Sequence, residues 1–481
     1  MITIIGLGPG DAQHWTRAAA QALQQAKMVY LRTAHHASVA NIPAPTTSFD
    51  NLASQTPAAI ATEVLRLALE EPDLVYAVPG HPVSDEASVP IILAQARAQA
   101  MPAKVIPGLS YTEAALVALN LNPAASLQLV QATSLATRYH APLEPDRPAL
   151  VLHLDRTELA LRIKRPLLNA YPHDFEVTLL HALGTAAERT VVCRLDQLET
   201  QAFEPFTLLY LPPDPAYSGF TTFQETIAHL RSPEGCPWDR EQSHQSLRPY
   251  LLEETYEVLE ALDGGDPAAL ADEMGDLLLQ IVLHAQVATD QAEFKMGTVL
   301  DHINRKMLRR HPHVFGNVIA NYADEVTANW EVIKQAEKAA KGQIEADRSA
   351  LDGVPTALPA LAEALAISKK AARVGFEWDN VEGVMDKIIE EAQEITQATT
   401  LPDLESEVGD LLFSVVNLAR WRKIDPESAL RATNARFKRR FRQMEQSAKA
   451  RGQNLAKLSI QQLDALWAEA KASSGSSPSG H

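Results

Sequence analysis

Two short acidic stretches decide the fold of the C-terminal half: Lys387-Ile388-Ile389-Glu390-Glu391-Ala392-Gln393-Glu394 and, 12 residues later, Glu407-Val408-Gly409-Asp410. Residues three apart lie on the same face of an α-helix, so Glu391 and Glu394 form one acidic pair, and Glu407 and Asp410 form another. Apolar residues flank both pairs, as in helices that bury one face. We therefore predict two helices whose acidic faces meet.

Two facing acidic pairs repel each other, at a cost of roughly a few tenths of a kcal/mol when exposed and more when partly buried. A divalent cation would remove this conflict. Because every ligand would be an oxygen atom, with no His or Cys among them, the set favours Mg²⁺ or Mn²⁺ over Zn²⁺. A solvated helix face is the alternative for either stretch taken alone.

An internal repeat favours metal binding over that alternative. Upstream, Glu253-Glu254-Thr255-Tyr256-Glu257 and Glu273-Met274-Gly275-Asp276 repeat the acidic pattern in the same order. Trp-Asp pairs precede the two copies, and similar basic segments follow them at 304–310 and 434–440. We therefore predict two homologous helical units joined near residues 339–355. The first unit would offer a second set of metal ligands: Glu254, Glu257, Glu273 and Asp276.

The two units differ in positive charge. The run from Arg436 to Arg442 contains no acid and suits phosphate, because guanidinium groups bind phosphate oxygens in pairs. Its alternatives are a solvated face or a nucleic-acid patch. Where the second unit has Lys387 and Lys438, the first has Tyr250 and Leu308. We therefore predict that the second unit is catalytic, and leave open whether the first is active or structural.

Length and charge set the wider frame. The chain has 481 residues and a formal net charge of -17. We expect about three domains, and no broad binding to nucleic acid or membranes because the surface is acidic. The chain has two cysteines and no CxxC pair, no signal-peptide pattern, and no apolar stretch of the ~20 residues that span a membrane. These features predict a soluble cytoplasmic protein.

The N-terminal part alternates short apolar runs with Ala-rich stretches, which indicates an α/β fold. The strand-like runs are 2–5, 74–78, 150–154, 177–180 and 207–211. A turn-rich segment at 212–219 predicts the main boundary. We predict an α/β domain over 1–213, helical domains over 220–338 and 355–472, and a disordered tail over 473–481.

Three glycine-containing turns follow strand-like runs in the α/β domain: 6–11 (Gly-Leu-Gly-Pro-Gly-Asp), 78–82 (Val-Pro-Gly-His-Pro) and 105–110 (Val-Ile-Pro-Gly-Leu-Ser). The first fails both the dinucleotide fingerprint and the P-loop pattern. Together the turns predict one ligand crevice at the carboxyl ends of the strands, and simple tight turns are the alternative.

Two pairs of histidines have plainer expectations. His35 and His36 could touch a ligand, but we expect exposed surface histidines. His311 and His313 flank a proline without a further ligand at suitable spacing, so we do not expect them to bind a metal.

The C-terminal motifs resemble the MazG family of nucleoside triphosphate pyrophosphohydrolases over residues 220–470. The resemblance rests on the acidic stretches, on Cys236-Pro237-Trp238-Asp239, and on His311-Pro312-His313-Val314-Phe315-Gly316. It implies an all-α fold with helices paired across a homodimer, and hydrolysis of a nucleoside triphosphate to the monophosphate and pyrophosphate. Bound metal ions would neutralise the phosphate oxygens.

The resemblance also implies roles for individual residues. The catalytic and Mg²⁺-binding set would be Glu390, Glu391, Glu394, Glu407 and Asp410, of which all but Glu390 are ligands. The triphosphate would be held by Lys387, Arg436, Lys438, Arg439 and Arg440, with Trp467 against the base.

The N-terminal turns resemble those of tetrapyrrole methylases, which bind S-adenosylmethionine between two α/β lobes. By motif, the cofactor contacts would be Pro9, Gly10, Gly80, His81, Gly108 and Ser110. His81 stands where that family has Asp, and Tyr111 where it has a second Ser, so we do not assume a porphyrin-precursor substrate.

A methylase ahead of a MazG pair resembles bacterial fusion proteins of the YabN type. Two hypotheses for the N-terminal domain follow: a methyltransferase of unknown acceptor, or a non-catalytic ligand sensor that regulates the pyrophosphohydrolase. A scaffold with degenerate sites is a third hypothesis for the whole chain, and the intact second carboxylate set argues against it.

Overall fold

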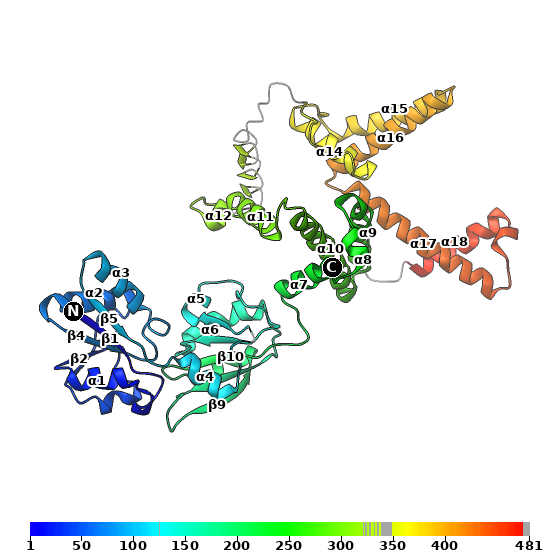
Figure 1. Ribbon diagram of the computed structural model, residues 1–481. Helices are drawn as coiled ribbons and strands as arrows, with labels where there is room; N and C mark the ends of the chain where they lie inside the picture. Colours follow the sequence, from blue (N-terminus) through cyan, green and yellow to red (C-terminus); the bar gives the residue numbers. More distant parts are fainter. Residues whose placement is uncertain are drawn as a thin grey trace. The chain divides into compact units, whose positions relative to one another are not determined.

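The computed structural model describes residues 1–124, 126–320 and 349–474, together with Tyr322 and residues 325–326, 329–330, 332–333 and 336–337. The chain divides into two compact units, Met1–Glu241 and Gln242–His481 (Figure 1). All strands of the described residues lie in the first unit, and the second is built from helices. The predicted fold class, an α/β domain followed by all-α domains, is confirmed.

The first lobe of the N-terminal unit is a parallel sheet of order β3-β2-β4-β1-β5. Its strands are β1 (Ile2–Gly6), β2 (Val29–Leu31), β3 (Thr46–Ser48), β4 (Leu74–Val78) and β5 (Ala103–Ile106). Helices α2 (Pro57–Glu70) and α3 (Ser88–Ala98) pack on one face and α1 (Arg17–Gln25) on the other. Helices on both faces explain the nearly continuous apolar runs of β1 and β4.

The second lobe is a mixed sheet of order β6-β7-β10-β8-β9 in which only β6 and β7 are parallel. The strands are β6 (Gln128–Gln131), β7 (Ala149–Leu152), β8 (Glu176–His181), β9 (Arg189–Arg194) and β10 (Leu208–Leu211). One face packs against α5 (Ala132–Leu135) and α6 (Thr157–Leu168), and the other against α4 (Tyr111–Leu119). The predicted two-lobed arrangement is therefore present.

Two further helices, α7 (Phe220–Leu230) and α8 (Pro237–Glu241), belong to the first unit. The start of α7 is bound to the second lobe: the Thr221 amide donates to Glu144 over 3.0 Å, and the Thr222 hydroxyl donates to Asp146. The structural division therefore falls at 241/242, whereas the sequence places the boundary at 213–219.

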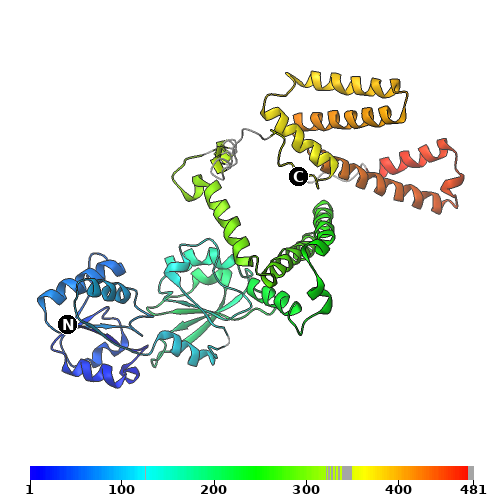
Figure 2. The same cartoon turned by 45° about the horizontal axis from the view of Figure 1, so that its top comes forward.

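The second unit repeats one helical hairpin (Figure 2). The first hairpin joins α9 (His244–Gly264) to α10 (Pro267–Asp290), and the second joins α15 (Val381–Gln397) to α16 (Leu401–Trp421). Side chains cap all four helices at their N-termini, namely Ser243, Asp266, Asn380 and Thr400. The internal repeat predicted from the sequence is thus a structural repeat.

The other helices of this unit are α11 (Met296–Arg310), α12 (Pro312–Phe315), α14 (Ala360–Arg373), α17 (Pro426–Ala450) and α18 (Ile460–Ser474). α17 and α18 pack through Met444, Ala448 and Leu466. Helix α18 extends two residues into the predicted tail, and residues 475–481 lie outside the described part. Within the described residues, no helix has the length and hydropathy that a membrane crossing requires.

Candidate active site and ligand sites

Three carboxylates meet on the second hairpin. Glu391 and Glu394 lie one turn apart on α15 and Glu407 faces them from α16, so that one oxygen of each lies within 4.8 Å of the others. Glu391 is 4% exposed, and Asp410, one turn further along α16, is exposed and lies outside this group. The structure therefore brings together three of the four predicted metal ligands.

Lys387 holds the buried carboxylate of this cluster. Its Nζ lies 2.6 Å from Oε1 of Glu391 and 3.1 Å from Oε1 of Glu390. Hydrogen bonding to Glu391, and next to Glu390, raises the pKa of Lys387, so the ammonium stays charged. Glu390 is outside the carboxylate group, and its observed contact is with Lys387.

The cluster is electrostatically strained. Partial desolvation and then the charges of Glu391 and Glu407 raise the pKa of Glu394, although Lys387 opposes the effect. Neighbouring carboxylates that disfavour each other's ionised state are what a divalent cation relieves.

The first hairpin holds a matching cluster of Glu254 and Glu257 on α9 with Glu273 on α10, again within 4.8 Å. Desolvation, then Glu257 and Asp276, raises the pKa of Glu254. Asp276 lies outside the group, as Asp410 does in the other hairpin. Gln280 is the amide neighbour here, with its Nε2 3.5 Å from Oε1 of Glu254. The twin sites therefore differ most clearly in the lysine.

The basic segments of the two repeats also differ. In the first, Arg309 and Arg310 both bind the Glu337 carboxylate, with 2.7 Å contacts from Arg309 Nε and Arg310 Nη2. In the second, on α17, Arg436 donates to the Thr433 hydroxyl over 3.0 Å. Lys438 and Arg439 are exposed and have no ion pair within the described residues. The second repeat therefore offers more free cationic charge to an anion.

The basic segment of α17 also includes Arg440, and the predicted base contact Trp467 lies beside it on α18. Ring centroids of Trp467 and Phe437 are 4.9 Å apart, and Trp467 packs against the Met444 cluster. No hydrogen bond or ion pair of the described residues joins these α17 cations to the carboxylates of α15 and α16. The phosphate and base contacts stay predictions.

His311 and His313 join no group of metal-competent side chains in the described part of the chain. The Nδ1 of His311 lies 2.7 Å from the Met307 carbonyl oxygen, which gives this imidazole a local structural partner.

The three glycine turns of the N-terminal unit meet at one edge of the first sheet. Gly8 and Gly80 exchange backbone hydrogen bonds of 3.2 and 2.9 Å. A Cβ added to Gly6 would lie 2.5 Å from the Gly108 nitrogen, and one added to Gly10 would lie 2.1 Å from the Gly184 oxygen. These glycines permit backbone-to-backbone packing, and Gly10 brings the first lobe against the second.

Other predicted cofactor contacts have local structural partners. Ser110 caps α4, where its hydroxyl accepts from Thr112 and its amide donates to Glu113. The Nδ1 of His81 accepts from the amides of Val83 and Ser84. Pro9 is buried.

Two polar groups that the sequence analysis missed lie beside these turns. One oxygen of Asp85 accepts from the amides of His81 and Tyr111, over 2.7 and 3.3 Å, whereas Oδ1 is buried without a partner. Nε2 of His153, just beyond β7, is also buried and unpartnered. Burial raises the pKa of Asp85 and lowers that of His153. Both follow strands whose carboxyl ends form the crevice, and that position was the available signal.

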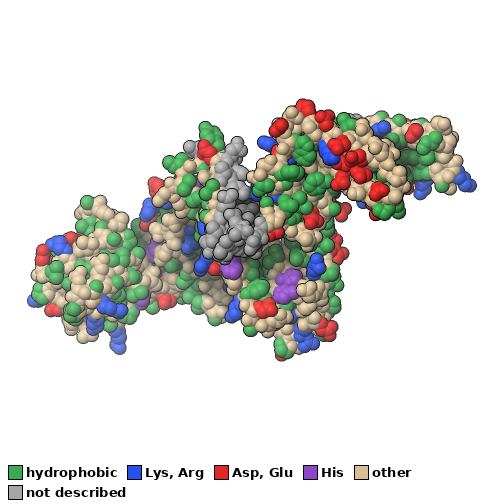
Figure 3. Space-filling view, turned by 90° about the horizontal axis from the view of Figure 1, so that it is seen from above, with side chains coloured by type: hydrophobic (Ala, Val, Ile, Leu, Met, Phe, Trp, Pro, Cys, Tyr) green, Lys and Arg blue, Asp and Glu red, His purple; other side chains and the backbone are tan. Residues whose placement is uncertain are grey.

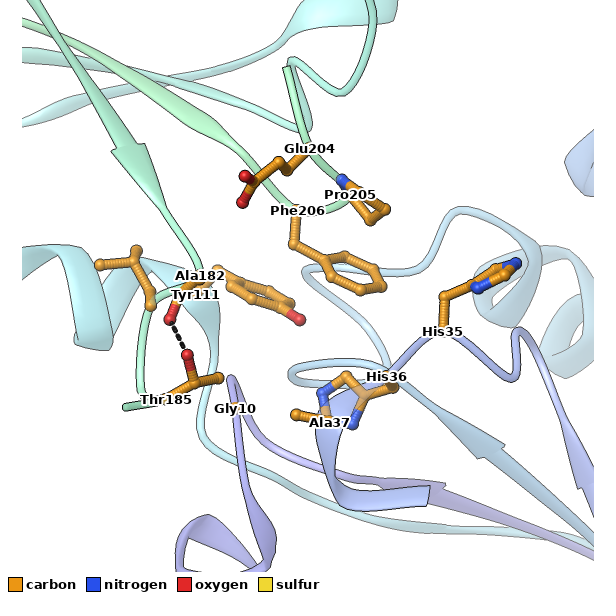
Figure 4. Close-up of a pocket in the computed structure, with 11 residues that line it drawn as sticks. Gly10, His35, His36, Ala37, Tyr111, Ala182, Thr185, Glu204, Pro205 and Phe206 are labelled. Atoms are coloured by element: carbon orange, nitrogen blue, oxygen red, sulfur yellow. Dashed lines mark hydrogen bonds between the residues drawn. The ribbon is translucent and has the colours of Figure 1, made fainter. Parts of the chain in front are cut away.

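A cavity of about 330 Å³ lies between the lobes (Figure 4). Gly10, His36, Tyr111 and Phe206 are among the residues that line it. His36 is 4% exposed, so the expectation of a surface histidine is wrong for it. Its Nε2 lies 3.0 Å from the Gly8 carbonyl oxygen and its Nδ1 2.9 Å from the Ser38 hydroxyl, and burial lowers its pKa to about 4. His35, at the cavity's edge, is exposed as expected.

Comparison with known proteins agrees with this division. Residues 242–315 and 380–444 match the MazG nucleotide pyrophosphohydrolase domain, once in each repeat. Residues 1–199 match the tetrapyrrole (corrin/porphyrin) methylases.

Similar full-length proteins show the same arrangement. YabN of Bacillus subtilis is 37% identical over 98% of both chains. The nucleoside triphosphate pyrophosphohydrolase/pyrophosphatase MazG of Thermotoga maritima is 44% identical, over 52% of this chain and 95% of its own length. Among solved structures, uroporphyrin-III C-methyltransferase of Thermus thermophilus covers 44% of this chain and 91% of its own, with 20% identity and a TM-score of 0.36.

Proposed function

Because the chain belongs to the MazG nucleotide pyrophosphohydrolase family, with a tetrapyrrole methylase domain ahead of the MazG repeats, we propose that its helical unit hydrolyses nucleoside triphosphates between the α and β phosphates. The products are a nucleoside monophosphate and pyrophosphate. The observation that carries this proposal is the cluster of Glu391, Glu394 and Glu407 with Lys387 bound to its buried member.

The donor set fits a hard divalent cation. Three carboxylate oxygens within 4.8 Å of one another, with no nitrogen or sulfur ligand among them, suit Mg²⁺ or Mn²⁺. Asp410 is the fourth ligand in this proposal, within reach of the cluster by a change of its exposed side chain. Bound there, the ion would supply charge neutralisation for the phosphate oxygens.

The protein's own groups bind and orient the substrate. Glu391 is held in place by Lys387 in the metal-free protein, and an ion beside Glu391 frees the ammonium to contact a phosphate oxygen. Arg436, Lys438, Arg439 and Arg440 hold the rest of the triphosphate, which suits their forked and point-charge donors. Trp467 contacts the base.

The products and the metal requirement test this directly. The protein is incubated with each of the eight common nucleoside triphosphates in Mg²⁺, Mn²⁺ or EDTA, and nucleotides and pyrophosphate are quantified. We expect monophosphate and pyrophosphate in equal amounts with either metal and none in EDTA. Diphosphate and orthophosphate as the products would contradict the proposed cleavage site, and undiminished turnover in EDTA would contradict the metal.

The helical unit is also proposed to act as a homodimer. Both hairpins expose large apolar side chains, among them Leu252 and Ile281 in the first and Ile389 and Leu412 in the second. Figure 3 shows hydrophobic side chains on the visible face of the molecule. Contiguous exposed apolar area favours association. Light scattering coupled to size-exclusion chromatography should give twice the 52.5 kDa chain mass, and a mass of one chain at micromolar concentration would refute the dimer.

For the N-terminal unit we propose binding of S-adenosylmethionine. The buried, unpartnered Asp85 Oδ1 and His153 Nε2 support this, because such atoms are costly unless a ligand or water pairs with them. The hydroxyl and amino groups of the cofactor could supply the partners. Pro9, Gly10, Gly80, His81, Gly108 and Ser110 form the surrounding turns.

Calorimetric titration tests the binding, and Asp85→Asn should weaken it. Absence of binding at millimolar ligand removes both the methyltransferase and the sensor hypotheses. If the ligand binds, a change in pyrophosphate release without S-adenosylhomocysteine production supports the sensor.

A further inference from the structure

The cavity between the two lobes of the N-terminal unit is built from aromatic rings. Tyr111 and Phe206 stack with centroids 5.1 Å apart and planes 14° apart, and His36 meets Phe206 edge-on at 5.8 Å. Figure 4 shows these three side chains gathered around one space, beside the Gly10 turn. Such walls offer π-faces and ring edges to a flat ligand.

The cavity lacks free charge. No Lys or Arg lines it. His36 is neutral, because burial lowers its pKa to about 4 and Gly8 and Ser38 engage its two nitrogens. The one lining carboxylate, Glu204, is bound by Arg189 over 2.6 Å. A ligand with several carboxylates would therefore enter without counter-ions, which is unfavourable in a partly buried site.

One lining group awaits a partner. The Tyr111 side chain is 2% exposed, and its hydroxyl has no hydrogen bond. The other lining hydroxyl, that of Thr185, donates to the Ala182 carbonyl over 2.8 Å. Because buried hydroxyls are normally paired, the Tyr111 hydroxyl marks the polar end of a binding site.

The backbone around the cavity is held in an uncommon conformation. Ala182 and Phe206 both line it with positive φ, 50° and 65°. For a bulky residue such as Phe206 this region is disfavoured, and such strain clusters at ligand sites. The strain at Phe206 accompanies the stacking of its ring on Tyr111.

We propose that this cavity binds an uncharged, planar heteroaromatic group of one or two fused rings, anchored by the Tyr111 hydroxyl, and that it does not take a polycarboxylate tetrapyrrole. The volume of about 330 Å³ lies at the lower end of the roughly 300–1,000 Å³ of small-molecule sites. The inference goes beyond the proposed function, because it requires neither nucleotide hydrolysis nor binding of S-adenosylmethionine.

Three probes test the ligand class on the full chain by ligand-observed NMR: quinoline-3-carboxamide, quinoline-3-carboxylate and uroporphyrin I. The first two share one ring system and differ in charge. We expect the amide to bind at least 10-fold more tightly than the carboxylate, and uroporphyrin to show no binding that the amide displaces. Equal affinity for the first two, absence of amide binding at millimolar concentration, or displaceable uroporphyrin binding would each overturn the proposal.

Two variants test the location. Tyr111→Phe should weaken the amide by about 2- to 12-fold, the value of one neutral hydrogen bond. Its matched control is Tyr171→Phe, since the Tyr171 hydroxyl is also buried and unpartnered but lies in the core outside the cavity. Ala37→Trp, at an exposed lining position, should block binding without disturbing the core. Loss of affinity in Tyr171→Phe equal to that in Tyr111→Phe, or unchanged binding to Ala37→Trp, would place the site elsewhere.

Discussion

Burial of His36 makes the N-terminal unit sensitive to acid. Its pKa falls from 6.5 in the unfolded chain to about 4 in the folded protein, because burial disfavours the imidazolium although the Gly8 carbonyl opposes the shift. Between these values the unfolded state binds more protons than the folded state. Stability is therefore fully present above pH 6.5 and is lost as the pH falls towards 4.

The magnitude follows from the shift. At 1.36 kcal/mol per pKa unit, His36 alone lowers the free energy of unfolding by about 3 kcal/mol between pH 7 and pH 4. The perturbation is His36→Gln, which keeps an amide donor for the Gly8 carbonyl but cannot titrate. Because other titrating groups contribute to both proteins, the quantity of interest is the difference between wild type and variant at each pH.

The assay is urea unfolding of the full chain at several pH values, read by hydrogen-exchange mass spectrometry from peptides of residues 1–48. We expect the stability of wild type relative to the variant to fall by about 3 kcal/mol from pH 7 to pH 4. A histidine NMR titration should give a pKa near 4 for the signal missing in the variant. A constant difference across this range, or a pKa near 6.5, would refute the reasoning.

Three further predictions concern packing and metal binding. Gly10→Ala should destabilise the N-terminal unit by about 1–3 kcal/mol in thermal unfolding, because φ is +123° and the new Cβ would lie 2.1 Å from the Gly184 oxygen; Gly297→Ala, in open space within α11, is the control and should not destabilise. Asn417→Leu, the residue found at the matching position 283, should cost the second repeat about 1–3 kcal/mol by denaturant titration, because the buried Ser368 hydroxyl donates to Asn417. Mg²⁺ at 100 times its dissociation constant should stabilise the helical unit by about 2.7 kcal/mol, and EDTA should abolish this in calorimetry. The results against these accounts are a stable Gly10→Ala, an unchanged Asn417→Leu, and a melting temperature insensitive to Mg²⁺.

Much of the fold could be predicted because the decisive patterns are local. The apolar runs at 2–5 and 74–78 are β1 and β4, and the helical repeat follows from i, i+3 spacing. The short strands β2 and β3, three residues each, carry too little pattern to be recognised. The attachment of α7 to the first unit depends on Glu144 and Asp146, which are far away in the sequence.

The candidate sites were predictable to different extents. The convergence of Glu391, Glu394 and Glu407 follows from helix geometry once the hairpin is assumed. The ion pairs of Lys387 could not be predicted, since its notebook role as a phosphate ligand comes from family resemblance and its charge also suits nearby carboxylates. Asp85, His153 and Phe206 are brought to the lobe interface by tertiary folding, so no local spacing revealed them.

Results

Sequence analysis

Two short acidic stretches decide the fold of the C-terminal half: Lys387-Ile388-Ile389-Glu390-Glu391-Ala392-Gln393-Glu394 and, 12 residues later, Glu407-Val408-Gly409-Asp410. Residues three apart lie on the same face of an α-helix, so Glu391 and Glu394 form one acidic pair, and Glu407 and Asp410 form another. Apolar residues flank both pairs, as in helices that bury one face. We therefore predict two helices whose acidic faces meet.

Two facing acidic pairs repel each other, at a cost of roughly a few tenths of a kcal/mol when exposed and more when partly buried. A divalent cation would remove this conflict. Because every ligand would be an oxygen atom, with no His or Cys among them, the set favours Mg²⁺ or Mn²⁺ over Zn²⁺. A solvated helix face is the alternative for either stretch taken alone.

An internal repeat favours metal binding over that alternative. Upstream, Glu253-Glu254-Thr255-Tyr256-Glu257 and Glu273-Met274-Gly275-Asp276 repeat the acidic pattern in the same order. Trp-Asp pairs precede the two copies, and similar basic segments follow them at 304–310 and 434–440. We therefore predict two homologous helical units joined near residues 339–355. The first unit would offer a second set of metal ligands: Glu254, Glu257, Glu273 and Asp276.

The two units differ in positive charge. The run from Arg436 to Arg442 contains no acid and suits phosphate, because guanidinium groups bind phosphate oxygens in pairs. Its alternatives are a solvated face or a nucleic-acid patch. Where the second unit has Lys387 and Lys438, the first has Tyr250 and Leu308. We therefore predict that the second unit is catalytic, and leave open whether the first is active or structural.

Length and charge set the wider frame. The chain has 481 residues and a formal net charge of -17. We expect about three domains, and no broad binding to nucleic acid or membranes because the surface is acidic. The chain has two cysteines and no CxxC pair, no signal-peptide pattern, and no apolar stretch of the ~20 residues that span a membrane. These features predict a soluble cytoplasmic protein.

The N-terminal part alternates short apolar runs with Ala-rich stretches, which indicates an α/β fold. The strand-like runs are 2–5, 74–78, 150–154, 177–180 and 207–211. A turn-rich segment at 212–219 predicts the main boundary. We predict an α/β domain over 1–213, helical domains over 220–338 and 355–472, and a disordered tail over 473–481.

Three glycine-containing turns follow strand-like runs in the α/β domain: 6–11 (Gly-Leu-Gly-Pro-Gly-Asp), 78–82 (Val-Pro-Gly-His-Pro) and 105–110 (Val-Ile-Pro-Gly-Leu-Ser). The first fails both the dinucleotide fingerprint and the P-loop pattern. Together the turns predict one ligand crevice at the carboxyl ends of the strands, and simple tight turns are the alternative.

Two pairs of histidines have plainer expectations. His35 and His36 could touch a ligand, but we expect exposed surface histidines. His311 and His313 flank a proline without a further ligand at suitable spacing, so we do not expect them to bind a metal.

The C-terminal motifs resemble the MazG family of nucleoside triphosphate pyrophosphohydrolases over residues 220–470. The resemblance rests on the acidic stretches, on Cys236-Pro237-Trp238-Asp239, and on His311-Pro312-His313-Val314-Phe315-Gly316. It implies an all-α fold with helices paired across a homodimer, and hydrolysis of a nucleoside triphosphate to the monophosphate and pyrophosphate. Bound metal ions would neutralise the phosphate oxygens.

The resemblance also implies roles for individual residues. The catalytic and Mg²⁺-binding set would be Glu390, Glu391, Glu394, Glu407 and Asp410, of which all but Glu390 are ligands. The triphosphate would be held by Lys387, Arg436, Lys438, Arg439 and Arg440, with Trp467 against the base.

The N-terminal turns resemble those of tetrapyrrole methylases, which bind S-adenosylmethionine between two α/β lobes. By motif, the cofactor contacts would be Pro9, Gly10, Gly80, His81, Gly108 and Ser110. His81 stands where that family has Asp, and Tyr111 where it has a second Ser, so we do not assume a porphyrin-precursor substrate.

A methylase ahead of a MazG pair resembles bacterial fusion proteins of the YabN type. Two hypotheses for the N-terminal domain follow: a methyltransferase of unknown acceptor, or a non-catalytic ligand sensor that regulates the pyrophosphohydrolase. A scaffold with degenerate sites is a third hypothesis for the whole chain, and the intact second carboxylate set argues against it.

Overall fold

The computed structural model describes residues 1–124, 126–320 and 349–474, together with Tyr322 and residues 325–326, 329–330, 332–333 and 336–337. The chain divides into two compact units, Met1–Glu241 and Gln242–His481 (Figure 1). All strands of the described residues lie in the first unit, and the second is built from helices. The predicted fold class, an α/β domain followed by all-α domains, is confirmed.

The first lobe of the N-terminal unit is a parallel sheet of order β3-β2-β4-β1-β5. Its strands are β1 (Ile2–Gly6), β2 (Val29–Leu31), β3 (Thr46–Ser48), β4 (Leu74–Val78) and β5 (Ala103–Ile106). Helices α2 (Pro57–Glu70) and α3 (Ser88–Ala98) pack on one face and α1 (Arg17–Gln25) on the other. Helices on both faces explain the nearly continuous apolar runs of β1 and β4.

The second lobe is a mixed sheet of order β6-β7-β10-β8-β9 in which only β6 and β7 are parallel. The strands are β6 (Gln128–Gln131), β7 (Ala149–Leu152), β8 (Glu176–His181), β9 (Arg189–Arg194) and β10 (Leu208–Leu211). One face packs against α5 (Ala132–Leu135) and α6 (Thr157–Leu168), and the other against α4 (Tyr111–Leu119). The predicted two-lobed arrangement is therefore present.

Two further helices, α7 (Phe220–Leu230) and α8 (Pro237–Glu241), belong to the first unit. The start of α7 is bound to the second lobe: the Thr221 amide donates to Glu144 over 3.0 Å, and the Thr222 hydroxyl donates to Asp146. The structural division therefore falls at 241/242, whereas the sequence places the boundary at 213–219.

The second unit repeats one helical hairpin (Figure 2). The first hairpin joins α9 (His244–Gly264) to α10 (Pro267–Asp290), and the second joins α15 (Val381–Gln397) to α16 (Leu401–Trp421). Side chains cap all four helices at their N-termini, namely Ser243, Asp266, Asn380 and Thr400. The internal repeat predicted from the sequence is thus a structural repeat.

The other helices of this unit are α11 (Met296–Arg310), α12 (Pro312–Phe315), α14 (Ala360–Arg373), α17 (Pro426–Ala450) and α18 (Ile460–Ser474). Helices α17 and α18 pack through Met444, Ala448 and Leu466. Helix α18 extends into the first residues of the predicted tail, and residues 475–481 lie outside the described part. Within the described residues, no helix has the length and hydropathy that a membrane crossing requires.

Candidate active site and ligand sites

Three carboxylates meet on the second hairpin. Glu391 and Glu394 lie one turn apart on α15 and Glu407 faces them from α16, so that one oxygen of each lies within 4.8 Å of the others. Glu391 is 4% exposed, and Asp410, one turn further along α16, is exposed and lies outside this group. The structure therefore brings together three of the four predicted metal ligands.

Lys387 holds the buried carboxylate of this cluster. Its Nζ lies 2.6 Å from Oε1 of Glu391 and 3.1 Å from Oε1 of Glu390. Hydrogen bonding to Glu391, and next to Glu390, raises the pKa of Lys387, so the ammonium stays charged. Glu390 is outside the carboxylate group, and its observed contact is with Lys387.

The cluster concentrates negative charge. Partial desolvation and then the charges of Glu391 and Glu407 raise the pKa of Glu394, although Lys387 opposes the effect. Neighbouring carboxylates that disfavour each other's ionised state are what a divalent cation relieves.

The first hairpin holds a matching cluster of Glu254 and Glu257 on α9 with Glu273 on α10, again within 4.8 Å. Desolvation, then Glu257 and Asp276, raises the pKa of Glu254. Asp276 lies outside the group, as Asp410 does in the other hairpin. Gln280 is the amide neighbour here, with its Nε2 3.5 Å from Oε1 of Glu254. The twin sites therefore differ most clearly in the lysine.

The basic segments of the two repeats also differ. In the first, Arg309 and Arg310 both bind the Glu337 carboxylate, with 2.7 Å contacts from Arg309 Nε and Arg310 Nη2. In the second, on α17, Arg436 donates to a threonine hydroxyl over 3.0 Å. Lys438 and its neighbour Arg439 are exposed and have no ion pair within the described residues. The second repeat therefore offers more cationic charge to an anion.

The basic segment of α17 also includes Arg440, and the predicted base contact Trp467 lies on α18, which packs against α17. Ring centroids of Trp467 and Phe437 are 4.9 Å apart, and Trp467 packs against the Met444 cluster. In the described part of the chain, no hydrogen bond or ion pair joins Arg436, Lys438 or Arg439 to the carboxylates of α15 and α16. The phosphate and base contacts stay predictions.

His311 and His313 join no group of metal-competent side chains among the residues that the structure describes. The Nδ1 of His311 lies 2.7 Å from the Met307 carbonyl oxygen, which gives this imidazole a local structural partner.

The three glycine turns of the N-terminal unit meet at one edge of the first sheet. Gly8 and Gly80 exchange backbone hydrogen bonds of 3.2 and 2.9 Å. A Cβ added to Gly6 would lie 2.5 Å from the Gly108 nitrogen, and one added to Gly10 would lie 2.1 Å from the oxygen of Gly184 in the second lobe. These glycines permit backbone-to-backbone packing, and Gly10 brings the first lobe against the second.

Other predicted cofactor contacts have local structural partners. Ser110 caps α4, where its hydroxyl accepts from an amide of the first turn and its own amide donates to Glu113. The Nδ1 of His81 accepts from the amides of Val83 and Ser84. Pro9 is buried.

Two polar groups that the sequence analysis missed lie beside these turns. One oxygen of Asp85 accepts from the amides of His81 and Tyr111, over 2.7 and 3.3 Å, whereas Oδ1 is buried without a partner. Nε2 of His153, just beyond β7, is also buried and unpartnered. Burial raises the pKa of Asp85 and lowers that of His153. Both residues follow strands that end at the crevice, and that position was the available signal.

A cavity of about 330 Å³ lies between the lobes (Figure 4). Among the residues that line it is His36, which is 4% exposed, so the expectation of a surface histidine is wrong for it. Its Nε2 lies 3.0 Å from the Gly8 carbonyl oxygen and its Nδ1 2.9 Å from the Ser38 hydroxyl, and burial lowers its pKa to about 4. His35, which also lines the cavity, is exposed as expected.

Comparison with known proteins agrees with this division. Residues 242–315 and 380–444 match the MazG nucleotide pyrophosphohydrolase domain, once in each repeat. Residues 1–199 match the tetrapyrrole (corrin/porphyrin) methylases.

Individual relatives match the whole chain or one part of it. YabN of Bacillus subtilis is 37% identical over 98% of both chains. The nucleoside triphosphate pyrophosphohydrolase/pyrophosphatase MazG of Thermotoga maritima is 44% identical, over 52% of this chain and 95% of its own length. Among solved structures, uroporphyrin-III C-methyltransferase of Thermus thermophilus covers 44% of this chain and 91% of its own, with 20% identity and a TM-score of 0.36.

Proposed function

Because the chain belongs to the MazG nucleotide pyrophosphohydrolase family, with a tetrapyrrole methylase domain ahead of the MazG repeats, we propose that its helical unit hydrolyses nucleoside triphosphates between the α and β phosphates. The products are a nucleoside monophosphate and pyrophosphate. The observation that carries this proposal is the cluster of Glu391, Glu394 and Glu407, with Lys387 bound to its buried member.

The donor set fits a hard divalent cation. Three carboxylate oxygens within 4.8 Å of one another, with no nitrogen or sulfur ligand among them, suit Mg²⁺ or Mn²⁺. Asp410, one turn from Glu407 on the same helix, is the fourth ligand in this proposal. Bound there, the ion would supply charge neutralisation for the phosphate oxygens.

The protein's own groups bind and orient the substrate. Lys387 holds Glu391 in the metal-free protein, and its ammonium becomes available to a phosphate oxygen once Glu391 has another cationic partner. Arg436, Lys438, Arg439 and Arg440 hold the rest of the triphosphate, since guanidinium forks and ammonium groups both bind phosphate. Trp467 contacts the base.

The products and the metal requirement test this directly. The protein is incubated with each of the eight common nucleoside triphosphates in Mg²⁺, Mn²⁺ or EDTA, and nucleotides and pyrophosphate are quantified. We expect monophosphate and pyrophosphate in equal amounts with either metal and none in EDTA. Diphosphate and orthophosphate as the products would contradict the proposed cleavage site, and undiminished turnover in EDTA would contradict the metal.

The helical unit also acts as a homodimer in this proposal. Both hairpins expose large apolar side chains, among them Leu252 and Ile281 in the first and Ile389 and Leu412 in the second. Figure 3 shows hydrophobic side chains on the visible face of the molecule. Exposed apolar area of this kind favours association. Light scattering after size-exclusion chromatography should give twice the 52.5 kDa chain mass, and the mass of one chain at micromolar concentration would refute the dimer.

For the N-terminal unit the proposed ligand is S-adenosylmethionine. The buried, unpartnered Asp85 Oδ1 and His153 Nε2 support this, because such atoms are costly unless a ligand or water pairs with them. The hydroxyl and amino groups of the cofactor would supply the partners. The surrounding turns are those of Pro9, Gly10, Gly80, His81, Gly108 and Ser110.

Calorimetric titration tests the binding, and Asp85→Asn should weaken it. Absence of binding at millimolar ligand removes both the methyltransferase and the sensor hypotheses. If the ligand binds, a change in the rate of pyrophosphate release without production of S-adenosylhomocysteine supports the sensor.

A further inference from the structure

The cavity between the two lobes of the N-terminal unit is built from aromatic rings. Tyr111 and Phe206 stack with centroids 5.1 Å apart and planes 14° apart, and His36 meets Phe206 edge-on at 5.8 Å. Figure 4 shows these three side chains gathered around one space, beside the Gly10 turn. Such walls offer π-faces and ring edges to a flat ligand.

The cavity lacks free charge. No Lys or Arg lines it. His36 is neutral, because burial lowers its pKa to about 4, and Gly8 and Ser38 engage its two nitrogens. The one lining carboxylate, Glu204, is bound by Arg189 over 2.6 Å. A ligand with several carboxylates would therefore enter without counter-ions, which is unfavourable in a partly buried site.

One lining group awaits a partner. The Tyr111 side chain is 2% exposed, and its hydroxyl has no hydrogen bond within the described structure. The other lining hydroxyl, that of Thr185, donates to the Ala182 carbonyl over 2.8 Å. Because buried hydroxyls are normally paired, the Tyr111 hydroxyl marks the polar end of a binding site.

The backbone around the cavity is held in an uncommon conformation. Ala182 and Phe206 both line it with positive φ, 50° and 65°. For a bulky residue such as Phe206 this region is disfavoured, and such strain clusters at ligand sites. The strained residue is the one whose ring stacks on Tyr111.

We propose that this cavity binds an uncharged, planar heteroaromatic group of one or two fused rings, anchored by the Tyr111 hydroxyl, and that it does not take a polycarboxylate tetrapyrrole. The volume of about 330 Å³ lies at the lower end of the roughly 300–1,000 Å³ of small-molecule sites. The inference goes beyond the proposed function, because it requires neither nucleotide hydrolysis nor binding of S-adenosylmethionine.

Three probes test the ligand class on the full chain by ligand-observed NMR: quinoline-3-carboxamide, quinoline-3-carboxylate and uroporphyrin I. The first two share one ring system and differ in charge. We expect the amide to bind about 10-fold more tightly than the carboxylate or better, which is a difference of ~1.4 kcal/mol. Uroporphyrin should show no binding that the amide displaces. Equal affinity for the first two, absence of amide binding at millimolar concentration, or displaceable uroporphyrin binding would each overturn the proposal.

Two variants test the location. Tyr111→Phe should weaken amide binding by about 2- to 12-fold, the value of one neutral hydrogen bond. Its matched control is Tyr171→Phe, since the Tyr171 hydroxyl is also buried and unpartnered but lies in the core outside the cavity. Ala37→Trp, at an exposed lining position, should block binding without disturbing the core. Equal losses in the two tyrosine variants, or unchanged binding to Ala37→Trp, would place the site elsewhere.

Discussion

Burial of His36 makes the N-terminal unit sensitive to acid. Its pKa falls from 6.5 to about 4 in the folded protein, because burial disfavours the imidazolium although the Gly8 carbonyl opposes the shift. Between these values the unfolded state binds more protons than the folded state. The contribution to stability is therefore fully present above pH 6.5 and is lost as the pH falls towards 4.

The magnitude follows from the shift. At about 1.36 kcal/mol per pKa unit, His36 alone lowers the free energy of unfolding by about 3 kcal/mol between pH 7 and pH 4. The perturbation is His36→Gln, which keeps an amide donor for the Gly8 carbonyl but cannot titrate. Because other titrating groups contribute to both proteins, the quantity of interest is the difference between wild type and variant at each pH.

The assay is urea unfolding of the full chain at several pH values, read by hydrogen-exchange mass spectrometry from peptides of residues 1–48. We expect the stability of wild type relative to the variant to fall by about 3 kcal/mol from pH 7 to pH 4. A histidine NMR titration should give a pKa of about 4 for the signal that is missing in the variant. A constant difference across this range, or an unshifted pKa, would refute the reasoning.

Three further predictions concern packing and metal binding. Gly10→Ala should destabilise the N-terminal unit by about 1–3 kcal/mol in thermal unfolding, because φ is +123° and the new Cβ would lie 2.1 Å from the Gly184 oxygen. Gly297→Ala, in open space within α11, is its control and should not destabilise. Asn417→Leu should cost the second repeat about 1–3 kcal/mol in denaturant titration, because the buried Ser368 hydroxyl donates to Asn417. Mg²⁺ at about 100 times its dissociation constant should stabilise the helical unit by ~2.7 kcal/mol in calorimetry, and EDTA should abolish this gain. The contrary results are a Gly10→Ala protein as stable as wild type, an unchanged Asn417→Leu protein, and a melting temperature insensitive to Mg²⁺.

Much of the fold could be predicted because the decisive patterns are local. The apolar runs at 2–5 and 74–78 are β1 and β4, and the helical repeat follows from residues spaced three and four apart. The strands β2 and β3 have 3 residues each and carry too little pattern to be recognised. The attachment of α7 to the first unit depends on Glu144 and Asp146, which lie far away in the sequence.

The candidate sites were predictable to different extents. The pairing of Glu391 with Glu394 follows from helix geometry, and Glu407 joins them once a hairpin is assumed. The ion pair of Lys387 with Glu391 is a local contact that the phosphate role left out of consideration. His153 and Phe206 reach the lobe interface through tertiary folding, so no local spacing could reveal them.

The central claim is that the second repeat carries the pyrophosphohydrolase activity. The most direct measurement is the rate of pyrophosphate release in Mg²⁺ by two matched variants, Glu407→Gln in the second repeat and Glu273→Gln in the first. Loss of an outer partner of a metal ligand costs about 10- to 100-fold, so loss of a ligand itself should cost about 100-fold or more. We expect that loss in Glu407→Gln and a rate near that of wild type in Glu273→Gln. The reverse order, or equal losses in both variants, would contradict the account.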